Sequence, residues 1–527
     1  MGLIPMMMIR KKNKDNSSMM KRQLLILLAL LPLLLAAQVG DLPRSAPAVE
    51  GVSTQAVIDM MDSLLALPDC EIHHVMVVRH GRVIAEVHPA PFRAEDSHTL
   101  YSASKTFTSL AVGIAIDENL LRLDDRVVTF FPDKRPDTIS DNLAAMTVRD
   151  LLMMAAGIKP DWQMRDLEGA DWIKVWLAKP CDEQPGTHFQ YDSMCTFMLS
   201  AIVQRVTGRT LLDYLNQKLF GPMHITQADW EMSPDGINTG GWGLRVQAET
   251  MAKLGLLLMN KGRWQGQQLV SAAYIEDACS PHVYYKNRKE TDAPTDGNQG
   301  YGYQIWRCKW PGAIRADGAF GQYSVVVPQA DLVVVILGMI PNGHPELACI
   351  WNQLMPGIKS DQPLQPEKKL QERLNKMYHT ASLPLPQGKR QSKKGEQIAG
   401  MIMQLDANQH GYRSLTITYD GSLLITYNDG TQDLISSAYG QWRYTKMRGF
   451  PPYSLNAVNR MRDLKHDFVA ASAYAWTSPT TLEVRVHYVN WISGTTFTFD
   501  FDKNEVTMHD NFPGSKPETI HFLGLRG

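Results

Sequence analysis

Residues 100–109 read LYSASKTFTS, with two serines just before a single lysine. The apolar run that continues to residue 118 predicts a helix beginning at Ser102. Ser102 and Lys105 then share one helix face, whereas Ser104 points away. A serine hydroxyl needs a base to become a nucleophile, and a lysine whose pKa is lowered by removal from water can be that base. The helix start also offers backbone N–H groups to an oxyanion. The spacing therefore selects Ser102 as the candidate nucleophile.

The same four residues have a plainer interpretation. Ser-x-x-Lys is a common pattern, and Ser18 and Lys21 near the N-terminus repeat it. A serine at a helix start often caps free backbone N–H groups while a nearby lysine stays in water. The tetrapeptide alone favours this cap, so the choice depends on the rest of the chain.

Strand and helix patterns around this segment predict an α+β domain over residues 45–355. Residues 72–78 and 82–87 form a hairpin pattern, and residues 323–327 and 332–337 form a second one. Helix patterns lie between the hairpins, at residues 102–118, 147–155 and 194–206. Strands at both ends with helices between them are typical of one antiparallel sheet flanked by helices.

The composition changes after this domain. Residues 356–400 are rich in proline and charge and contain one helix pattern at residues 366–377, so we expect a linker with a short helix. Over residues 401–527, β-rich runs alternate with turns such as Asp420-Gly421. This pattern predicts an all-β C-terminal domain, a small barrel or a sandwich, with no catalytic motif in it.

The N-terminus has the features of an export signal. Lys21 and Arg22 precede an apolar run over residues 24–37, which is short for a membrane-spanning helix. We expect a signal peptide over residues 1–37, with translation starting at Met19 or Met20 and cleavage before Gln38. Cleavage would release a periplasmic or extracellular protein, whereas an uncleaved signal would anchor it in the membrane.

The net charge and the spacing of potential metal ligands limit the kinds of partner that the protein is expected to bind. The formal net charge of −1 and the lack of a basic stripe argue against nucleic acid. No HExxH or CxxC pattern occurs, so we expect no metal. The spacing of the six cysteines leaves their pairing open, although Cys195 and Cys349 lie in apolar runs typical of buried thiols.

Several sequence blocks carry a family resemblance. They are LYSASKTFTSLAVGIAIDENLLRLDD (residues 100–125), TVRDLLMMAAGI (147–158), PGTHFQYDSMCTFMLSAIVQRVTG (185–208), YGYQIW (301–306) and DGAFGQYSVVVPQADLVVVILG (317–338). In this order, over roughly residues 50–355, the chain resembles the β-lactamase-related serine hydrolases. That family includes class C β-lactamases, penicillin-binding DD-peptidases, D-aminopeptidases, esterases and aminohexanoate-oligomer hydrolases. The resemblance implies a β-lactamase/DD-peptidase-like fold and makes Ser102 a nucleophile rather than a cap.

The family's second motif, Tyr-x-Asn, corresponds here to Tyr191-Asp192-Ser193. The resemblance implies that Tyr191 shares proton transfer with Lys105. Ser193 replaces the usual asparagine, and its hydroxyl can still bond Lys105 or a substrate carbonyl.

The third motif, Lys-Thr-Gly or His-x-Gly, corresponds to Ala316-Asp317-Gly318, so the family's cation is missing. That cation helps β-lactamases and carboxypeptidases hold a substrate carboxylate, which Asp317 would repel. Arg315 is a weak substitute for it, because adjacent strand residues face opposite ways. Gly318 permits close backbone approach, and the N–H groups of Ser102 and Ala319 would form the oxyanion hole.

These residues predict an exported serine hydrolase that cleaves an amide or ester bond through an acyl-enzyme and needs no cofactor. The expected substrate is a small molecule or short peptide that is neutral or amine-bearing: a D-amino-acid derivative, an amino-acid oligomer or an ester. Two alternatives stay open, a β-lactamase or DD-peptidase, and a non-catalytic penicillin sensor or surface binding protein. We expect no nucleic-acid partner and no membrane contact beyond the signal segment; the oligomeric state is not predicted.

Overall fold

The computed structural model describes residues 41–526, apart from residues 162, 164–166, 168, 286–288, 290, 342–343, 453–460, 462–463, 466 and 512–513. The described helices and strands belong to one compact unit, Arg44–Gly527. The expected signal peptide over residues 1–37 lies outside the described residues. Within the described part of the chain, no helix is both long and apolar enough to cross a membrane.

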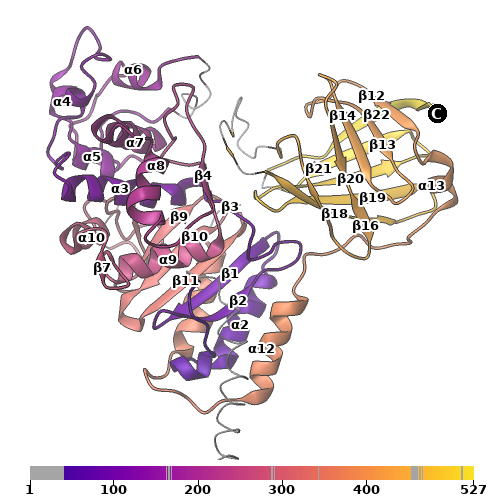
Figure 1. Cartoon of the computed structure of the whole chain (residues 1–527), viewed down its shortest axis with the longest axis horizontal. Helices are drawn as coiled ribbons and strands as arrows, with labels where there is room; N and C mark the ends of the chain where they lie inside the picture. The colour runs from indigo at the N-terminus through magenta and orange to yellow at the C-terminus, as the bar shows by residue number, and fades with distance from the viewer. Residues whose placement is uncertain are drawn as a thin grey trace, which may run out of the picture. The chain divides into compact units, whose positions relative to one another are not determined.

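A six-stranded antiparallel sheet forms the centre of the α+β domain (Figure 1). Its strands, in the spatial order β2-β1-β11-β10-β9-β8, are β2 (Arg82–Val87), β1 (Glu71–Arg79), β11 (Leu332–Met339), β10 (Gln322–Val327), β9 (Ile314–Gly318) and β8 (Trp306–Arg307). The two predicted hairpins are β1–β2 and β10–β11. They share one sheet because β1 pairs with β11, for example at Val75 and Ile336. The predicted antiparallel sheet is therefore confirmed.

Helices cover both faces of this sheet. Helix α9 (Ala248–Met259) packs along β1, β10 and β11, while α2 (Thr54–Leu65) contributes to the core on the opposite face. Alternate residues of β11 face the two layers, so Val334 lies in the core with α2 whereas Val333 lies against Gly255 of α9. A strand covered on both faces must be apolar throughout, and every residue of β11 is buried.

A helical layer carries the segment around Ser102. Its helices are α3 (Ser104–Asp117), α4 (Asp141–Ala145), α5 (Val148–Leu152), α6 (Trp172–Leu177), α7 (Ser193–Thr207), α8 (Leu211–Leu215) and α10 (Ala272–Cys279). Helix α3 is buried from Ser104 to Ala115 and packs against α7, α8 and α10. A helix that is apolar on nearly all sides is stable only in the centre of a domain. Two small sheets of the described chain lie in sequence between β2 and β8. They are β3 (His98–Thr99) with β5 (Leu244–Val246) and β4 (Ala228–Trp230), and β6 (Arg263–Trp264) with β7 (Gln267–Gln268).

Three α-helices in the described part of the chain follow the α+β sheet in sequence. Helix α11 (Pro345–Cys349) comes directly after β11. The helix pattern at residues 366–377 corresponds to α12 (Lys368–Thr380), whose Leu374 is buried in the core that α2 shares. A further short helix, α13 (Lys393–Ile398), was not predicted from the sequence.

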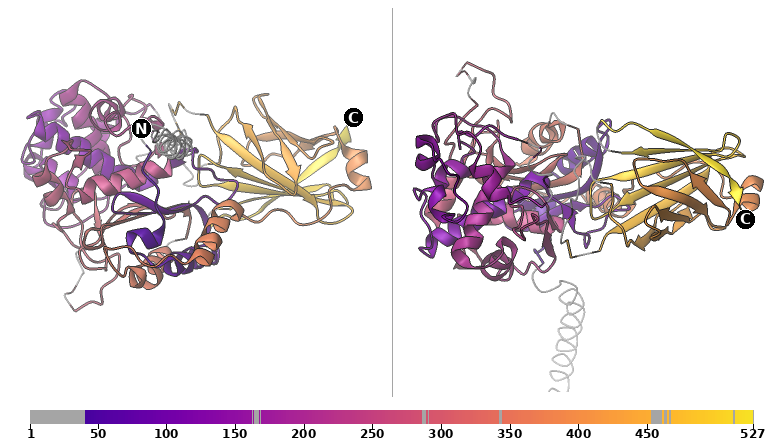
Figure 2. Two further views of the ribbon diagram at one scale, coloured as in Figure 1. Left: turned by 60° about the horizontal axis from the view of Figure 1, so that its bottom comes forward. Right: turned by 90° about the horizontal axis from the view of Figure 1, so that it is seen from above.

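The C-terminal strands form an all-β, nearly closed barrel (Figure 2). They are β12 (Ile402–Leu405), β13 (Tyr412–Ile417), β14 (Leu423–Tyr427), β15 (Gln432–Ile435), β16 (Ser437–Tyr439), β17 (Arg443–Lys446), β18 (Val469–Trp476), β19 (Thr481–Tyr488), β20 (Gly494–Asp500), β21 (Glu505–Asp510) and β22 (Glu518–Arg526). The sheet runs β15-β14-β13-β12-β22-β21-β20-β19-β18-β16, with β17 paired to β18, and β15 lies beside β17 and β18. Alternation places Phe497 and Phe499 inside. The predicted all-β C-terminal domain is confirmed.

Candidate active site

Ser102 lies in a short 3-10 helix, η2 (Tyr101–Ala103), between β3 and α3. The hydroxyl of Ser104 donates to the carbonyl oxygen of Tyr101 (2.6 Å) and accepts from the N–H of Leu244 (3.2 Å). The N–H of Leu100 donates to the carbonyl of Leu244 (2.9 Å). Ser104 therefore ties this turn to β5, and Ser102 is the serine that contacts Lys105.

Lys105 is almost completely buried, and its Nζ lies at the centre of the site. It donates hydrogen bonds to Ser102 Oγ (3.0 Å), Ser193 Oγ (3.0 Å) and the carbonyl oxygen of Gly241 (2.6 Å). At this distance a neutral Lys105 amine can accept the Ser102 proton, and an ammonium can return it. The two side chains can therefore exchange a proton in place.

Tyr191 and Ser193 meet this pair from the start of α7. The side chain of Asp192 caps the helix by accepting from the N–H of Met194 (2.9 Å), which fixes the residues on either side of it. The Tyr191 ring lies under Lys105 Nζ, 4.9 Å from its centroid. Burial raises the pKa of Tyr191 above its ordinary value, although a hydrogen bond with Ser102 opposes this shift. The phenol is therefore protonated at neutral pH and can pass on a proton.

Gly318 brings the end of β9 against the Ser102 turn. A Cβ on Gly318 would lie 2.2 Å from the carbonyl oxygen of Leu100 and 3.1 Å from the N of Ala103. Only a residue without a side chain permits this approach. Gln322 Nε2 then holds the next turn by donating to the carbonyls of Ala319 (3.2 Å) and Phe320 (2.9 Å). The backbone segments that carry the N–H groups of Ser102 and Ala319 are thus in contact.

Asp317 is paired with a cation on its own strand. Its Oδ2 accepts from Arg315 Nε at 2.8 Å, because residues two apart on a strand face the same way. Arg315 is buried and also donates to the carbonyls of Asp296 (2.8 Å) and Arg307 (3.0 Å). This pair was not predicted from the sequence. The ion pair offsets much of the negative charge of Asp317. Ala316, which stands at the position of the family's cation, has no charged side chain.

Tyr191 lies among aromatic rings that were not predicted as site residues. They belong to Phe189, Tyr285, Tyr301 and Trp306, and the Tyr191 and Trp306 rings lie 5.8 Å apart. Burial, together with the negative charge of Asp317, raises the pKa values of Tyr285 and Tyr301. Asp317 therefore lies close to these rings. The blocks PGTHFQYDS and YGYQIW already contain most of these residues, but nothing in them shows that they converge.

The six cysteines do not compete with Ser102. All six are free thiols, and Cys195 and Cys349 are buried as predicted from their apolar surroundings. Burial raises the pKa of Cys70, Cys181 and Cys308 to about 11, so they are protonated at neutral pH. A protonated thiol is a poor nucleophile.

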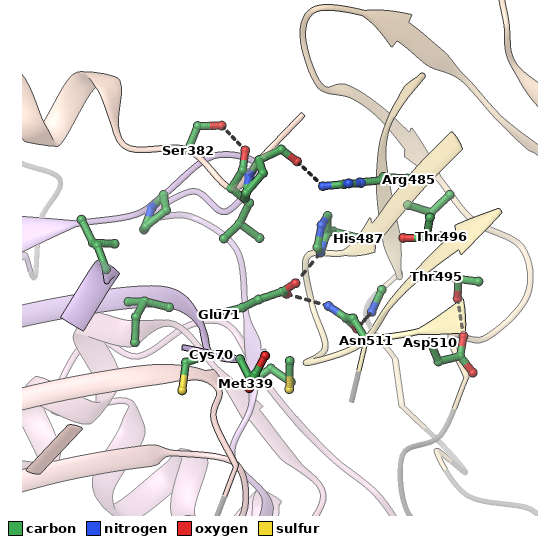
Figure 3. A pocket seen from close by; sticks show the side chains of 18 of the residues that line it. Cys70, Glu71, Met339, Ser382, Arg485, His487, Thr495, Thr496, Asp510 and Asn511 are labelled. Atoms are coloured by element: carbon green, nitrogen blue, oxygen red, sulfur yellow. Dashed lines mark hydrogen bonds and ion pairs between the residues drawn. The ribbon is translucent and has the colours of Figure 1, made fainter. Parts of the chain in front are cut away.

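A separate cavity of ≈ 800 Å³ lies between the end of β1 and strands β19 to β21 (Figure 3). The Glu71 carboxylate points into it, accepts from Asn511 Nδ2 (2.6 Å) and lies 3.6 Å from His487 Nδ1. Burial acts to raise the pKa of Glu71, but His487, His73 and Asn511 outweigh it and lower the pKa to about 2. The described residues around this cavity include none of the predicted site residues.

Next to Glu71, four histidines form two hydrogen-bonded pairs. The Nδ1 of His73 lies 2.9 Å from Nε2 of His98, and the Nδ1 of His74 lies 2.8 Å from Nδ1 of His88. Burial lowers the pKa of His73, His74 and His98, so these imidazoles are neutral at pH 7. No group of three or more His, Cys, Asp or Glu residues in the described part of the chain is arranged to hold a metal ion.

Comparison with known proteins identifies the family. The model of the beta-lactamase family matches residues 72–348, which include β1, α3, α7 and β9 to β11. The chain belongs to the beta-lactamase family. As a member of this family it is a serine hydrolase, with the catalytic fold predicted from the blocks around Ser102.

Individual relatives in the beta-lactamase family differ in how much of the chain they match. A 6-aminohexanoate-dimer hydrolase of Paenarthrobacter ureafaciens is 26% identical over 356 residues, which cover 62% of this chain and 89% of that protein. A D-aminopeptidase of Brucella anthropi is 28% identical over 168 residues, only 29% of this chain and 30% of that protein. A solved penicillin-binding protein of Bacillus halodurans has 18% identity and a TM-score of 0.44, covering 56% of this chain and 98% of that one.

Proposed function

We propose that this chain hydrolyses a small amide or ester through an acyl-enzyme on Ser102. The observation that carries the proposal is the 3.0 Å contact between Lys105 Nζ and Ser102 Oγ, inside a buried site that also contains the Tyr191 phenol. A nucleophile next to a base that is itself oriented by other groups is the arrangement that covalent catalysis requires. Ser193 and the Gly241 carbonyl supply that orientation by bonding Lys105.

In the first half-reaction, Ser102 Oγ attacks the substrate carbonyl while its proton passes to Lys105. The N–H groups of Ser102 and Ala319 stabilise the negative oxygen of the tetrahedral intermediate. The Tyr191 phenol and Lys105 then return the proton to the leaving nitrogen or oxygen, and the bond from carbonyl carbon to leaving group breaks. A water molecule then attacks the carbonyl carbon of the acyl-enzyme and gives a proton to the same relay. The bond from the carbonyl carbon to Ser102 Oγ breaks, the relay returns the proton to Oγ, and the acid product is released.

The proposed substrate is neutral or carries an amine: a short peptide, a D-amino-acid derivative, an amino-acid oligomer or an ester. Ala316 offers no charge to a substrate carboxylate, and Arg315 is already bonded to Asp317 and two backbone carbonyls. The rings around Tyr191 provide apolar faces and π-faces that suit an alkyl chain or an ammonium group. The names of the two relatives, a 6-aminohexanoate-dimer hydrolase and a D-aminopeptidase, also support a substrate that carries an amine.

Two experiments test the function and the substrate class. Intact-mass spectrometry after treatment with a fluorophosphonate should show one adduct on the native protein and none on Ser102→Ala. In paired kinetics, D-amino-acid amides and esters should turn over faster than matched peptides ending in D-Ala-D-Ala carboxylate and faster than penicillin. The reverse order would identify a DD-peptidase or β-lactamase. A penicillin adduct that never turns over would identify a sensor, and a lack of adduct with either probe would identify a binding protein.

We also propose that the enzyme is exported. The support is the apolar run over residues 24–37 behind Lys21 and Arg22. Mass spectrometry of the protein recovered outside the cytoplasm should give a mature N-terminus at Gln38. Recovery of the full-length chain from the cytoplasm alone would refute export without affecting the proposed chemistry.

A further inference from the structure

The two proposed oxyanion donors are each next to an aromatic residue with an unusual backbone. Tyr101 directly precedes Ser102 and has φ of 45°, while Phe320 directly follows Ala319 and has φ of 64°. Bulky residues rarely adopt positive φ, and such backbone strain persists only where the surroundings enforce it. The positions of the two N–H groups therefore depend on whatever holds these two residues.

Tyr101 and Phe320 hold each other. Their rings pack edge to face, with centroids 5.3 Å apart and planes at 73°. This contact links the Ser102 turn to the turn after β9, beyond the backbone approach that Gly318 permits. The Tyr101 ring also contacts a second aromatic partner.

That partner is Trp491 of the C-terminal barrel. Its ring lies 6.0 Å from the Tyr101 ring, and Trp491 is only 1% exposed. Tyr101 and Phe320 both pack into the hydrophobic core of the barrel, which includes Phe468 and Trp491. Trp491 lies in the turn between β19 and β20. The residue before it, Asn490, donates a hydrogen bond from Nδ2 to the carbonyl oxygen of Ser97 (3.4 Å), which directly precedes β3. The barrel core and the nucleophile turn are thus continuous.

We propose that Trp491 is a positioning residue that keeps the Tyr101–Phe320 pair, and through it the N–H groups of Ser102 and Ala319, in the geometry of an oxyanion hole. This inference rests on the proposed acyl-enzyme function. Under this proposal, the C-terminal barrel supports the turn that carries the nucleophile. Trp491 itself touches neither substrate nor reacting atoms, so its effect must appear in the rate of bond formation rather than in substrate binding.

The test compares three substitutions in the full-length protein. Trp491→Ala should lower kcat on an ester substrate by about 10- to 100-fold, since loss of one oxyanion donor or a shift of about 1 Å has effects of that order or larger. KM should stay within about twofold, and the pH–rate profile should keep its shape because Lys105 and Tyr191 are untouched. Trp491→Phe, which restores a ring, should recover most of kcat.

Trp476→Ala is the matched control, because Trp476 is a buried tryptophan of the same barrel whose ring packs on Phe501 at 5.7 Å. It should lower thermal stability as Trp491→Ala does but leave kcat near that of the native enzyme. Phe320→Leu approaches the same contact from the catalytic side and should reproduce the kcat loss if Trp491→Ala fails to fold.

The rate of fluorophosphonate labelling separates the two proposals. If the native enzyme is not labelled at Ser102, the proposed function fails. If it is labelled and Trp491→Ala is labelled at the same rate, or if Trp491→Ala and Trp476→Ala lose kcat equally, the positioning role of Trp491 is refuted. Slower labelling in Trp491→Ala by the same factor as kcat supports it.

Discussion

Replacing Gly318 with alanine is a sharp test of the oxyanion geometry, since it adds one methyl group between β9 and the Ser102 turn. The new Cβ would lie 2.2 Å from the Leu100 carbonyl oxygen and 2.8 Å from the Cβ of Gln322. A relaxed carbon–oxygen contact is about 3.3 Å, so the two segments must separate by about 1 Å. A displacement of that size costs about 100-fold in rate. Overpacking of this kind also destabilises the fold by about 1–3 kcal/mol.

Steady-state kinetics on an activated ester, with thermal unfolding followed by circular dichroism, measures both effects. We expect Gly318→Ala to lose about 100-fold in kcat while still folding at assay temperature. Gly297→Ala is the control, because the nearest atom to its new Cβ would be 3.9 Å away. A Gly318→Ala enzyme with kcat within about twofold of the native value would refute the idea that this contact sets the oxyanion hole.

Three further substitutions test the proton relay and the buried histidines. Lys105→Met should lower kcat/KM by about 10³-fold, which is the scale expected for loss of a general base, and it should slow fluorophosphonate labelling by a similar factor. A labelling rate near that of the native enzyme would exclude Lys105 as the base. Tyr191→Phe should cost about 100-fold, and since burial raises the pKa of Tyr191, ionisation of this phenol should not limit the native rate up to about pH 10 in a pH–rate profile. For His74, burial lowers the folded-state pKa, so below about pH 6.5 the unfolded chain binds a proton that the folded chain does not. The free energy of unfolding therefore decreases as the pH is lowered below about 6.5. His74→Gln should flatten that fall by up to about 1.4 kcal/mol per pH unit, measured from urea unfolding at pH 7.5 and 5.5; parallel curves for both proteins would contradict it.

The contact between Ser102 and Lys105 could be predicted because it is local. The structure starts α3 at Ser104 rather than Ser102, with a 3-10 helix before it. A 3-10 helix has three residues per turn, so residues three apart still align and the contact survives the change of helix type. The sheet could be predicted equally well, since apolar runs such as residues 332–337 indicate a buried strand without knowledge of their neighbours.

The ion pair between Arg315 and Asp317 in the third motif was harder to predict. The two-residue spacing of Arg315 and Asp317 places them on the same face of β9, but it does not reveal that Arg315 is buried or that Asp296 and Arg307 hold it. Those contacts depend on loops that meet only in the folded chain. The expected repulsion of carboxylates by Asp317 is accordingly weaker than its sequence position suggests, and the lack of a cation at Ala316 carries the substrate argument.

The aromatic contacts behind the site could not be predicted at all. Tyr101, Phe320 and Trp491 lie in different thirds of the sequence, and each follows an ordinary local pattern. Their rings meet only because the barrel packs against the nucleophile turn. Positive φ at Tyr101 and Phe320 is also invisible in sequence, because glycine or asparagine is the usual sign of that conformation.

The long separation between Ser102 and Trp491 has a consequence for how the protein is made. Ribosomes add about 5–20 residues per second, so the nucleophile emerges roughly 20 to 80 seconds before the tryptophan that supports it. Strand β1 must likewise wait for its partner β11, which is encoded about 260 residues later. A growing chain therefore carries an incomplete site through most of its synthesis. If Trp491 acts as we infer, the enzyme reaches its full catalytic rate only when nearly the whole polypeptide has been translated.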